Sequence, residues 1–240
     1  MPIVTVTASV VAALAAIAQY AVPAVIPALE RIPLDAHQWW RLVTPLLVQT
    51  LGWYQVVTNL VTLALVGAVV EQSMGRRRWA ALFAAGTLGG QIAAYSWHEP
   101  GGGDSIAICG LAGGVLVWLL VSRPANRWAA WIVVGYVAAL TGWGFGGIRA
   151  AAVATLIAGV ALIVVPDKRF PLAVAAACAI ALAAASDLHG VSLLSGMIAG
   201  VLLTRPWRHR GEQATPVTGL STPDTIDPQL VDAPAANDPL

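Results

Sequence analysis

The chain has 240 residues, of which 58% are hydrophobic and only 10% charged, and its mean hydropathy is +0.75. Soluble domains carry about 45–50% apolar and about 25% charged residues, so this composition excludes a soluble globular protein and indicates an integral membrane protein. The formal net charge of +1 gives no support for a nucleic-acid partner.

Apolar stretches that approach the ~20 residues needed to cross a bilayer recur along most of the chain. They predict an all-α fold, a polytopic membrane helix bundle of about eight transmembrane helices. In chain order the predicted spans are residues 4–26, 55–70, 79–97, 105–122, 128–143, 148–165, 170–186 and 190–204. The second and the last are short, so their ends are the least well defined.

Basic residues test this topology, because they gather in the loops on the cytoplasmic side of a membrane. With an even number of spans and an inside N-terminus, the inner loops hold ten of the thirteen: Arg76, Arg77, Arg78, Arg123, Arg127, Lys168, Arg169, Arg205, Arg208 and Arg210. The outer side holds Arg31, Arg41 and Arg149. Both termini are therefore expected in the cytoplasm. A re-entrant segment in place of one helix pair stays open.

The first span lacks the basic start of a secretory signal, so we expect it to be retained. Residues 1–210 are predicted to form the transmembrane domain. Residues 211–240 hold five prolines, five acidic residues and no basic residue, which predicts a disordered cytoplasmic tail. Cys109 and Cys178 fall in different spans without metal-type spacing, so we expect small buried residues and neither a metal nor a cofactor.

Polar residues inside predicted spans are expensive and therefore informative. In the second span Gln55 and Asn59 lie four apart, on one helix face, where hydrogen bonding to a neighbouring helix is the ordinary interpretation. Glu71 at the inner boundary needs a partner or water, and Gly75 permits a tight turn after it.

Ser105 follows the glycine-rich outer segment of residues 101–104 and opens an apolar span. A serine in that place is a candidate nucleophile, provided that a base takes its proton. The ordinary interpretation of Asp104 is that it caps the helix and interacts with the helix dipole.

These residues occur in an order that resembles the rhomboid family of intramembrane serine proteases: Trp40, Arg41, Asn59, Glu71, Gly75, Ser105, Gly196 and Gly200. The resemblance covers residues 38–114 closely and the last span more loosely. It implies a rhomboid-like core and a Ser–His dyad that cleaves membrane-embedded substrates. Ser105 takes the place of the nucleophile, and Asn59 and Gln55 take the places of side chains that help to bind the oxyanion. Glutamine replaces the family's histidine at Gln55 and again at Gln49.

The family's catalytic histidine has no counterpart in this chain. If Gly196 and Gly200 are the paired glycines of the family's last core span, the position of the histidine is Leu193. If the sixth span corresponds to that core span instead, the position is Ala152. His189 lies one helical turn before Leu193, and Asp187 could orient it. A shift of about 5–6 Å along the helix favours the other interpretation, in which this Asp-Leu-His-Gly segment only caps the helix.

Two functions therefore stay open. One is an active serine endopeptidase of variant geometry, with Ser105 as nucleophile and His189 as base. The other is a catalytically inactive pseudoprotease that binds transmembrane helices of client proteins, which the missing base favours. A transporter built from inverted repeats has no support in matching halves. A single Lys against twelve Arg, with abundant Ala and Gly, indicates a bacterial genome rich in GC and hence the plasma (inner) membrane.

Overall fold

The computed structural model describes residues 1–33, 37–121, 126–167 and 169–211. The chain divides into two compact units, Met1–Arg205 and Pro206–Leu240, and the helical bundle belongs to the first unit. The predicted tail, residues 211–240, lies outside the described residues except for Gly211.

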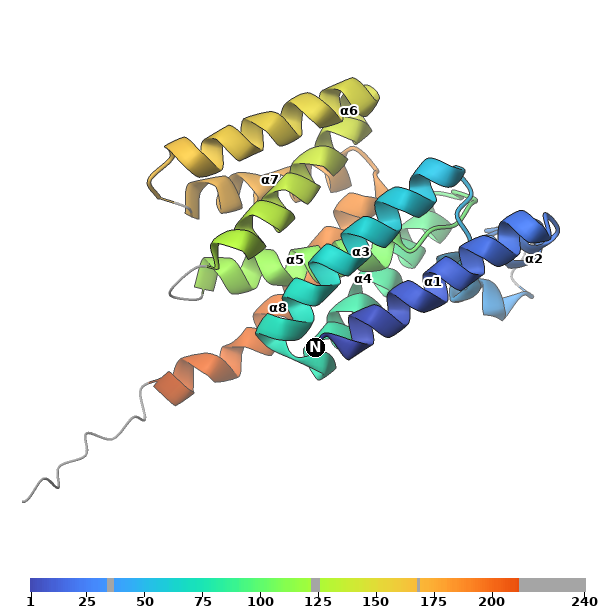
Figure 1. Ribbon diagram of the computed structural model, residues 1–240, viewed down its shortest axis with the longest axis horizontal. Coiled ribbons are helices and arrows are strands. Elements are labelled where there is room, and N and C mark those ends of the chain that lie inside the picture. Colours follow the sequence, from blue (N-terminus) through green and yellow to red (C-terminus); the bar gives the residue numbers. More distant parts are fainter. Residues whose placement is uncertain (34–36, 122–125, 168, 212–240) are drawn as a thin grey trace, which may run out of the picture. The chain divides into compact units, whose positions relative to one another are not determined.

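The elements of the described residues are all helices, which confirms the predicted all-α fold class (Figure 1). The helices are α1 (Ile3–Ala21), α2 (Val25–Leu29), α3 (Trp53–Met74), α4 (Arg76–Ser96), α5 (Ser105–Val121), α6 (Arg127–Val164), α7 (Arg169–Ala184) and α8 (Leu188–Gly211). Two short 3₁₀ helices, η1 (Trp39–Leu42) and η2 (Thr44–Leu47), lie between α2 and α3.

Among the described residues, three helices are long and apolar enough to cross a bilayer, namely α1, α3 and α6. Shorter apolar helices are α5, α7 and the part of α8 up to Thr204. The first span was predicted to run to residue 26, but α1 ends at Ala21. Val22 is extended before Pro23, as a residue that precedes proline tends to be, and this separates α1 from the five-residue α2.

The fifth and sixth predicted spans are the two arms of α6. Gly147 has φ +71° and ψ −163°, a backbone conformation that glycine adopts without the steric penalty of a side chain, and the helix reverses there. The arms pack against each other along their length, since Gly142 lies against Ala151 and Trp131 lies beside Gly159. The break at Gly147 therefore gives the bundle two antiparallel arms within one helical element.

Helix α5 is the centre of the bundle, and it is buried along nearly its whole length. It packs against α3, α4, α6 and α7. A helix that is apolar on all sides is expected in such a place, and its small residues allow neighbouring backbones to come close. Ser105, at the start of α5, is therefore carried by a helix that is enclosed on all sides by the described bundle.

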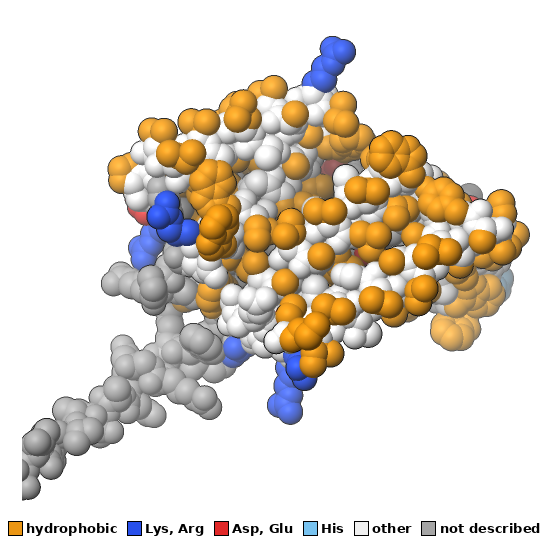
Figure 2. All heavy atoms as spheres, viewed as in Figure 1, with side chains coloured by type: hydrophobic (Ala, Val, Ile, Leu, Met, Phe, Trp, Pro, Cys, Tyr) orange, Lys and Arg blue, Asp and Glu red, His pale blue; other side chains and the backbone are white. Residues whose placement is uncertain are grey.

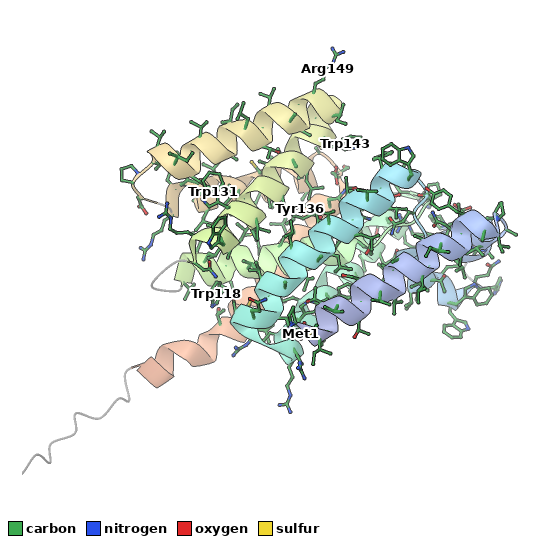
Figure 3. All side chains as sticks on the ribbon, viewed as in Figure 1. Met1, Trp118, Trp131, Tyr136, Trp143 and Arg149 are labelled. Atoms are coloured by element: carbon green, nitrogen blue, oxygen red, sulfur yellow. The ribbon has the colours of Figure 1, made fainter. Side chains whose placement is uncertain are left out.

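The surface agrees with a membrane environment. Figure 2 shows apolar side chains spread over α1, α3 and α6, with Lys and Arg side chains only at the margins of this face. Arg149 and Trp143 lie at one end of the bundle, and Met1 and Trp118 lie at the opposite end (Figure 3). At the first of these ends Trp143 of α6 contacts Tyr54 of α3, with ring centroids 5.6 Å apart.

Candidate active site

Ser105 is held by the loop that leads into α5. Gly101 exchanges two backbone hydrogen bonds with Arg31, with N···O distances of 2.8 and 3.2 Å. The N–H of Gly103 donates to the carbonyl oxygen of Pro45 at 2.8 Å. The loop is thus attached to two other segments, and this fixes the place where α5 begins.

His189 lies in the first turn of α8, and the structure brings it to Ser105. The distance from Ser105 Oγ to His189 Nε2 is 3.0 Å, and the distance from His189 Nδ1 to Asp187 Oδ1 is 2.8 Å. A carboxylate can only accept, so Nδ1 carries the hydrogen and Nε2 presents its lone pair to the serine. The three side chains have the connectivity of a serine–imidazole–carboxylate triad.

Asp187 also caps α8, because its Oδ1 accepts the backbone N–H of His189 at 2.8 Å. Burial by itself would raise the pKa of the Asp187 carboxyl, but the hydrogen bonds and the charge of His189 outweigh burial and hold that pKa below its ordinary value. Capping of α8 and orientation of His189 were alternative interpretations of Asp187 in the sequence. The carboxylate makes both contacts.

Helices α5 and α8 touch backbone to backbone. A Cβ on Gly196 would overlap the backbone of Gly110, and a Cβ on Gly200 would lie 3.0 Å from the Cα of Gly114. Such contacts are possible only between residues without side chains, as in other closely packed membrane helices. The two glycines of the last span are thus packing residues that hold α8 against α5.

This packing explains how His189 reaches the serine. Ser105 at the start of α5 lies beside the first turn of α8, since its Oγ is 3.0 Å from His189 Nε2. At a rise of about 1.5 Å per residue, Leu193 lies about 6 Å further along α8 than His189.

The family position of the base is occupied by a packing residue. Leu193 is completely buried, and its carbonyl faces Gly113 of α5. The alternative position, Ala152, is exposed on the second arm of α6. Of these two helices, α8 is the one that brings a side chain to Ser105.

The predicted oxyanion residues lie in a buried polar network. Both amide N–H groups of Asn59 are engaged, because Nδ2 donates to Asp104 Oδ1 and to Gln49 Oε1, each at 2.8 Å. Gln49 Nε2 donates to the same oxygen of Asp104 at 2.9 Å. Gln55 lies closer to the loop, and its Nε2 donates to the carbonyl oxygen of Gly102 at 3.0 Å. Asn59 is thus bonded within the protein, whereas Gln55 uses one of its two N–H groups.

Sequence reasoning missed one member of this network. Gln19 of α1 is buried and pairs with the backbone of Gln49, accepting from its N–H at 2.8 Å and donating to its carbonyl at 3.3 Å. A lone Gln in a long apolar span was the available signal. A second missed neighbour is Tyr136 of α6, whose hydroxyl lies 3.4 Å from the thiol of Cys109. Cys109 is buried, as predicted, and Cys178 is partly buried.

The Trp40-Arg41 motif stabilises the segment between α2 and η1. Arg41 is buried, and its guanidinium donates to the carbonyls of Glu30 and Pro27 and to the side chain of Gln38. Trp40 is 39% exposed and makes an edge contact with Trp39. These contacts indicate a structural role for the motif.

Glu71 and Gly75 lie at the opposite end of α3. Glu71 accepts the backbone N–H groups of Val4 and Thr5 and the Thr5 hydroxyl at 2.8–3.0 Å, and it pairs with Arg76 at 3.3 Å. It thereby satisfies the first turn of α1, whose N–H groups have no partner within the helix. Gly75 has φ +86°, which lets α4 begin directly after α3.

A pocket of about 230 Å³ opens beside the imidazole. It is lined by Glu99, Gly144, Phe145 and Leu182 together with Asp187 and His189. Gly144 contributes to this opening, because a Cβ there would come within 3.2 Å of Asp187 Oδ2. One side of Asp187 and His189 is therefore accessible from this pocket.

The fold and the site together define a membrane-embedded helical protein with a serine–imidazole pair at one end of the bundle. The family model described as the Rhomboid domain matches residues 36–169, which is more than half of the chain. The chain therefore belongs to the rhomboid family. No curated protein and no solved structure matched the sequence.

Proposed function

We propose that this protein is an intramembrane serine endopeptidase of the rhomboid type, with Ser105 as nucleophile and His189 as base. The observation that carries the proposal is the distance of 3.0 Å between Ser105 Oγ and His189 Nε2, with Asp187 bonded to the other ring nitrogen. Nucleophile and base must come within roughly 2.6–3.2 Å for proton transfer.

In the proposed reaction Ser105 Oγ attacks the carbonyl carbon of a substrate peptide bond while its proton passes to His189 Nε2. The oxyanion is held by the backbone N–H groups of Ser105 and Ile106, which begin α5 and lack acceptors within the helix, and by the remaining N–H of Gln55. His189 then protonates the leaving amine, and an acyl-enzyme forms. Water, deprotonated by His189, releases the acyl group and regenerates Ser105.

Family membership implies substrates embedded in the bilayer, and we propose transmembrane segments of other proteins. The distribution of basic residues supports insertion in the plasma (inner) membrane of a bacterium with both termini in the cytoplasm. In this arrangement Ser105 lies toward the outer face. The transmembrane domain would comprise residues 1–210, and residues 211–240 would form a cytoplasmic tail.

A second function, binding of client helices without catalysis, is favoured by one observation. Both amide N–H groups of Asn59 are taken by Asp104 and Gln49, which removes one expected oxyanion donor. Client binding needs the helical bundle but no activated serine.

Labelling of the detergent-solubilised protein with a fluorophosphonate probe separates the two functions. We expect labelling of wild type, and none of Ser105→Ala or His189→Asn. Ser96→Ala and His98→Asn, which change a serine and a histidine on the exposed surface, serve as matched controls and should label like wild type. Absence of labelling in folded wild type, beside an active rhomboid that does label, would overturn the peptidase proposal in favour of client binding.

A further inference from the structure

Asp104 directly precedes the nucleophile and has an unusual environment. It is 3% exposed, and its Oδ1 accepts both the amide of Gln49 at 2.9 Å and the amide of Asn59 at 2.8 Å. Its Oδ2 is buried and has no hydrogen-bond partner in the described part of the chain. One oxygen of this carboxyl is therefore fully used, and the other is not.

This environment disfavours a negative charge. The side chains that contact the carboxyl are neutral amides, and no cation pairs with it among the described residues. The titratable groups that face this region are Tyr136 of α6, Cys109 of α5 and, through Ser105, His189 of α8. From α1 and α3 the facing groups are the amides of Gln19, Gln55 and Asn59. Burial raises the pKa of the Asp104 carboxyl, and the amide hydrogen bonds only partly oppose this effect.

We propose that Asp104 is an uncharged carboxylic acid that acts as a positioning residue for the oxyanion side of the site. Its Oδ1 orients the amides of Gln49 and Asn59, and its Oδ2 carries the proton. This role rests on the proposed peptidase function.

The benefit of a neutral Asp104 follows from its place in the chain. The N–H groups of Ser105 and Ile106, which are the proposed oxyanion donors, come directly after it. A carboxylate there would repel the negative charge that develops on the substrate oxygen, and in a poorly hydrated site such repulsion is weakly screened. A neutral acid keeps its two amide contacts without opposing that charge.

Asp104→Asn is the decisive variant, because it keeps an acceptor for both amides and is uncharged at every pH. Its infrared difference spectrum against wild type at neutral pH should contain the carbonyl stretch of a protonated carboxylic acid, shifted in D₂O. The control Asp167→Asn, at an exposed position, shows what replacing an aspartate by an asparagine contributes to the spectrum at another site. Carboxylate bands in the Asp104 difference spectrum would overturn the proposal, and this readout does not depend on catalysis.

Kinetics supply the second readout. The rate at which the fluorophosphonate labels Ser105 should fall in wild type at high pH and stay level in Asp104→Asn, with rates within about threefold of each other at neutral pH. Asp104→Leu, which offers the amides no acceptor, should lose more than about tenfold. A tenfold loss in Asp104→Asn would overturn the positioning role. If wild type does not label at all, the peptidase function fails while the infrared result still decides the state of Asp104.

Discussion

The contact between Gly196 and Gly110 makes Gly196→Ala a direct test of how the site is assembled. A Cβ on Gly196 would lie well inside 3.0 Å of three backbone atoms of Gly110, a separation that real Cβ atoms essentially never show. The obstacle is helix backbone, which cannot rotate away as a side chain can. We therefore expect α8 to move from α5 by about 1 Å, because closely packed interiors transmit such strain.

This displacement has a predictable effect on the proposed catalytic pair. Ser105 is carried by α5 and His189 by α8, so their separation of 3.0 Å would grow to about 4 Å, beyond the roughly 3.2 Å limit for proton transfer. A misplacement of about 1 Å can cost on the order of 10²-fold in rate, and we expect that loss for labelling of Ser105. Overpacking should also lower the free energy of unfolding by about 1–3 kcal/mol.

The assay is the rate of fluorophosphonate labelling per folded molecule, with folding followed by thermal unfolding in detergent. Gly135→Ala is the matched control, since a Cβ at Gly135 would have no atom within 4 Å. Gly200→Ala should be intermediate, because its Cβ would lie 3.0 Å from Gly114. Wild-type labelling by Gly196→Ala would refute the argument that backbone contact between α5 and α8 sets the distance from serine to imidazole.

Further expectations concern the first turn of α8 and the start of α1. Asp187→Asn keeps an oxygen that can cap α8, so the melting temperature should change little. It removes the charge that fixes the tautomer of His189, so the labelling of Ser105 should fall on the order of 10²–10⁴-fold. Labelling equal to wild type would contradict this role of Asp187. Because the folded-state pKa of Asp187 is lowered, its charge stabilises the fold above the unfolded pKa, and this stabilisation disappears as pH falls through the folded pKa. Any difference in melting temperature between wild type and Asp187→Asn should therefore disappear in acid. A difference that persists there would show that the contacts with His189 do not cause the lowered pKa of Asp187. The double change His189→Ala with Leu193→His should not recover the labelling that His189→Ala loses, because position 193 lies about 6 Å further along α8 than His189, which contacts Ser105. Recovery of labelling would contradict this placement of Ser105 beside the first turn of α8. Glu71→Ala should lower the free energy of unfolding by on the order of 3 kcal/mol, measured by thermal unfolding, because the first turn of α1 loses its acceptor, and an unchanged melting temperature would contradict that role.

The sequence predicted the fold class well because hydropathy determines where apolar helices form. It placed the end of the first helix less well, because there the backbone and not hydropathy decides. Pro23 ends the first helix five residues early, although apolar residues continue on both sides of it. The break at Gly147 falls within the predicted gap between the spans of residues 128–143 and 148–165, but α6 stays helical up to Gly146, so the interruption is shorter than predicted.

The candidate site was harder to predict, because it depends on distances between helices. Hydropathy and motif spacing identified Ser105, His189 and Asp187 as candidates, yet the separation of serine and imidazole follows from the level of α8 against α5. That level is set by contacts such as Gly110 with Gly196, which no local pattern specifies. The sequence gives the separation of His189 and Leu193 along the helix, but not which of the two positions lies beside Ser105.

The polar residues of the site fall into two chemically different groups, and this division bears on the proposed mechanism. On the side of α3 the contacts come from the neutral amides of Gln49, Gln55 and Asn59 and, in our proposal, from an uncharged Asp104. On the side of α8 lies a carboxylate paired with an imidazole. During the proposed reaction negative charge would develop beside the neutral group, and positive charge would develop on His189 beside the ionised Asp187. An ionised Asp104 would place a second negative charge beside the developing oxyanion. The protonation state of Asp104 therefore bears on whether Ser105 and His189 can act as a catalytic pair.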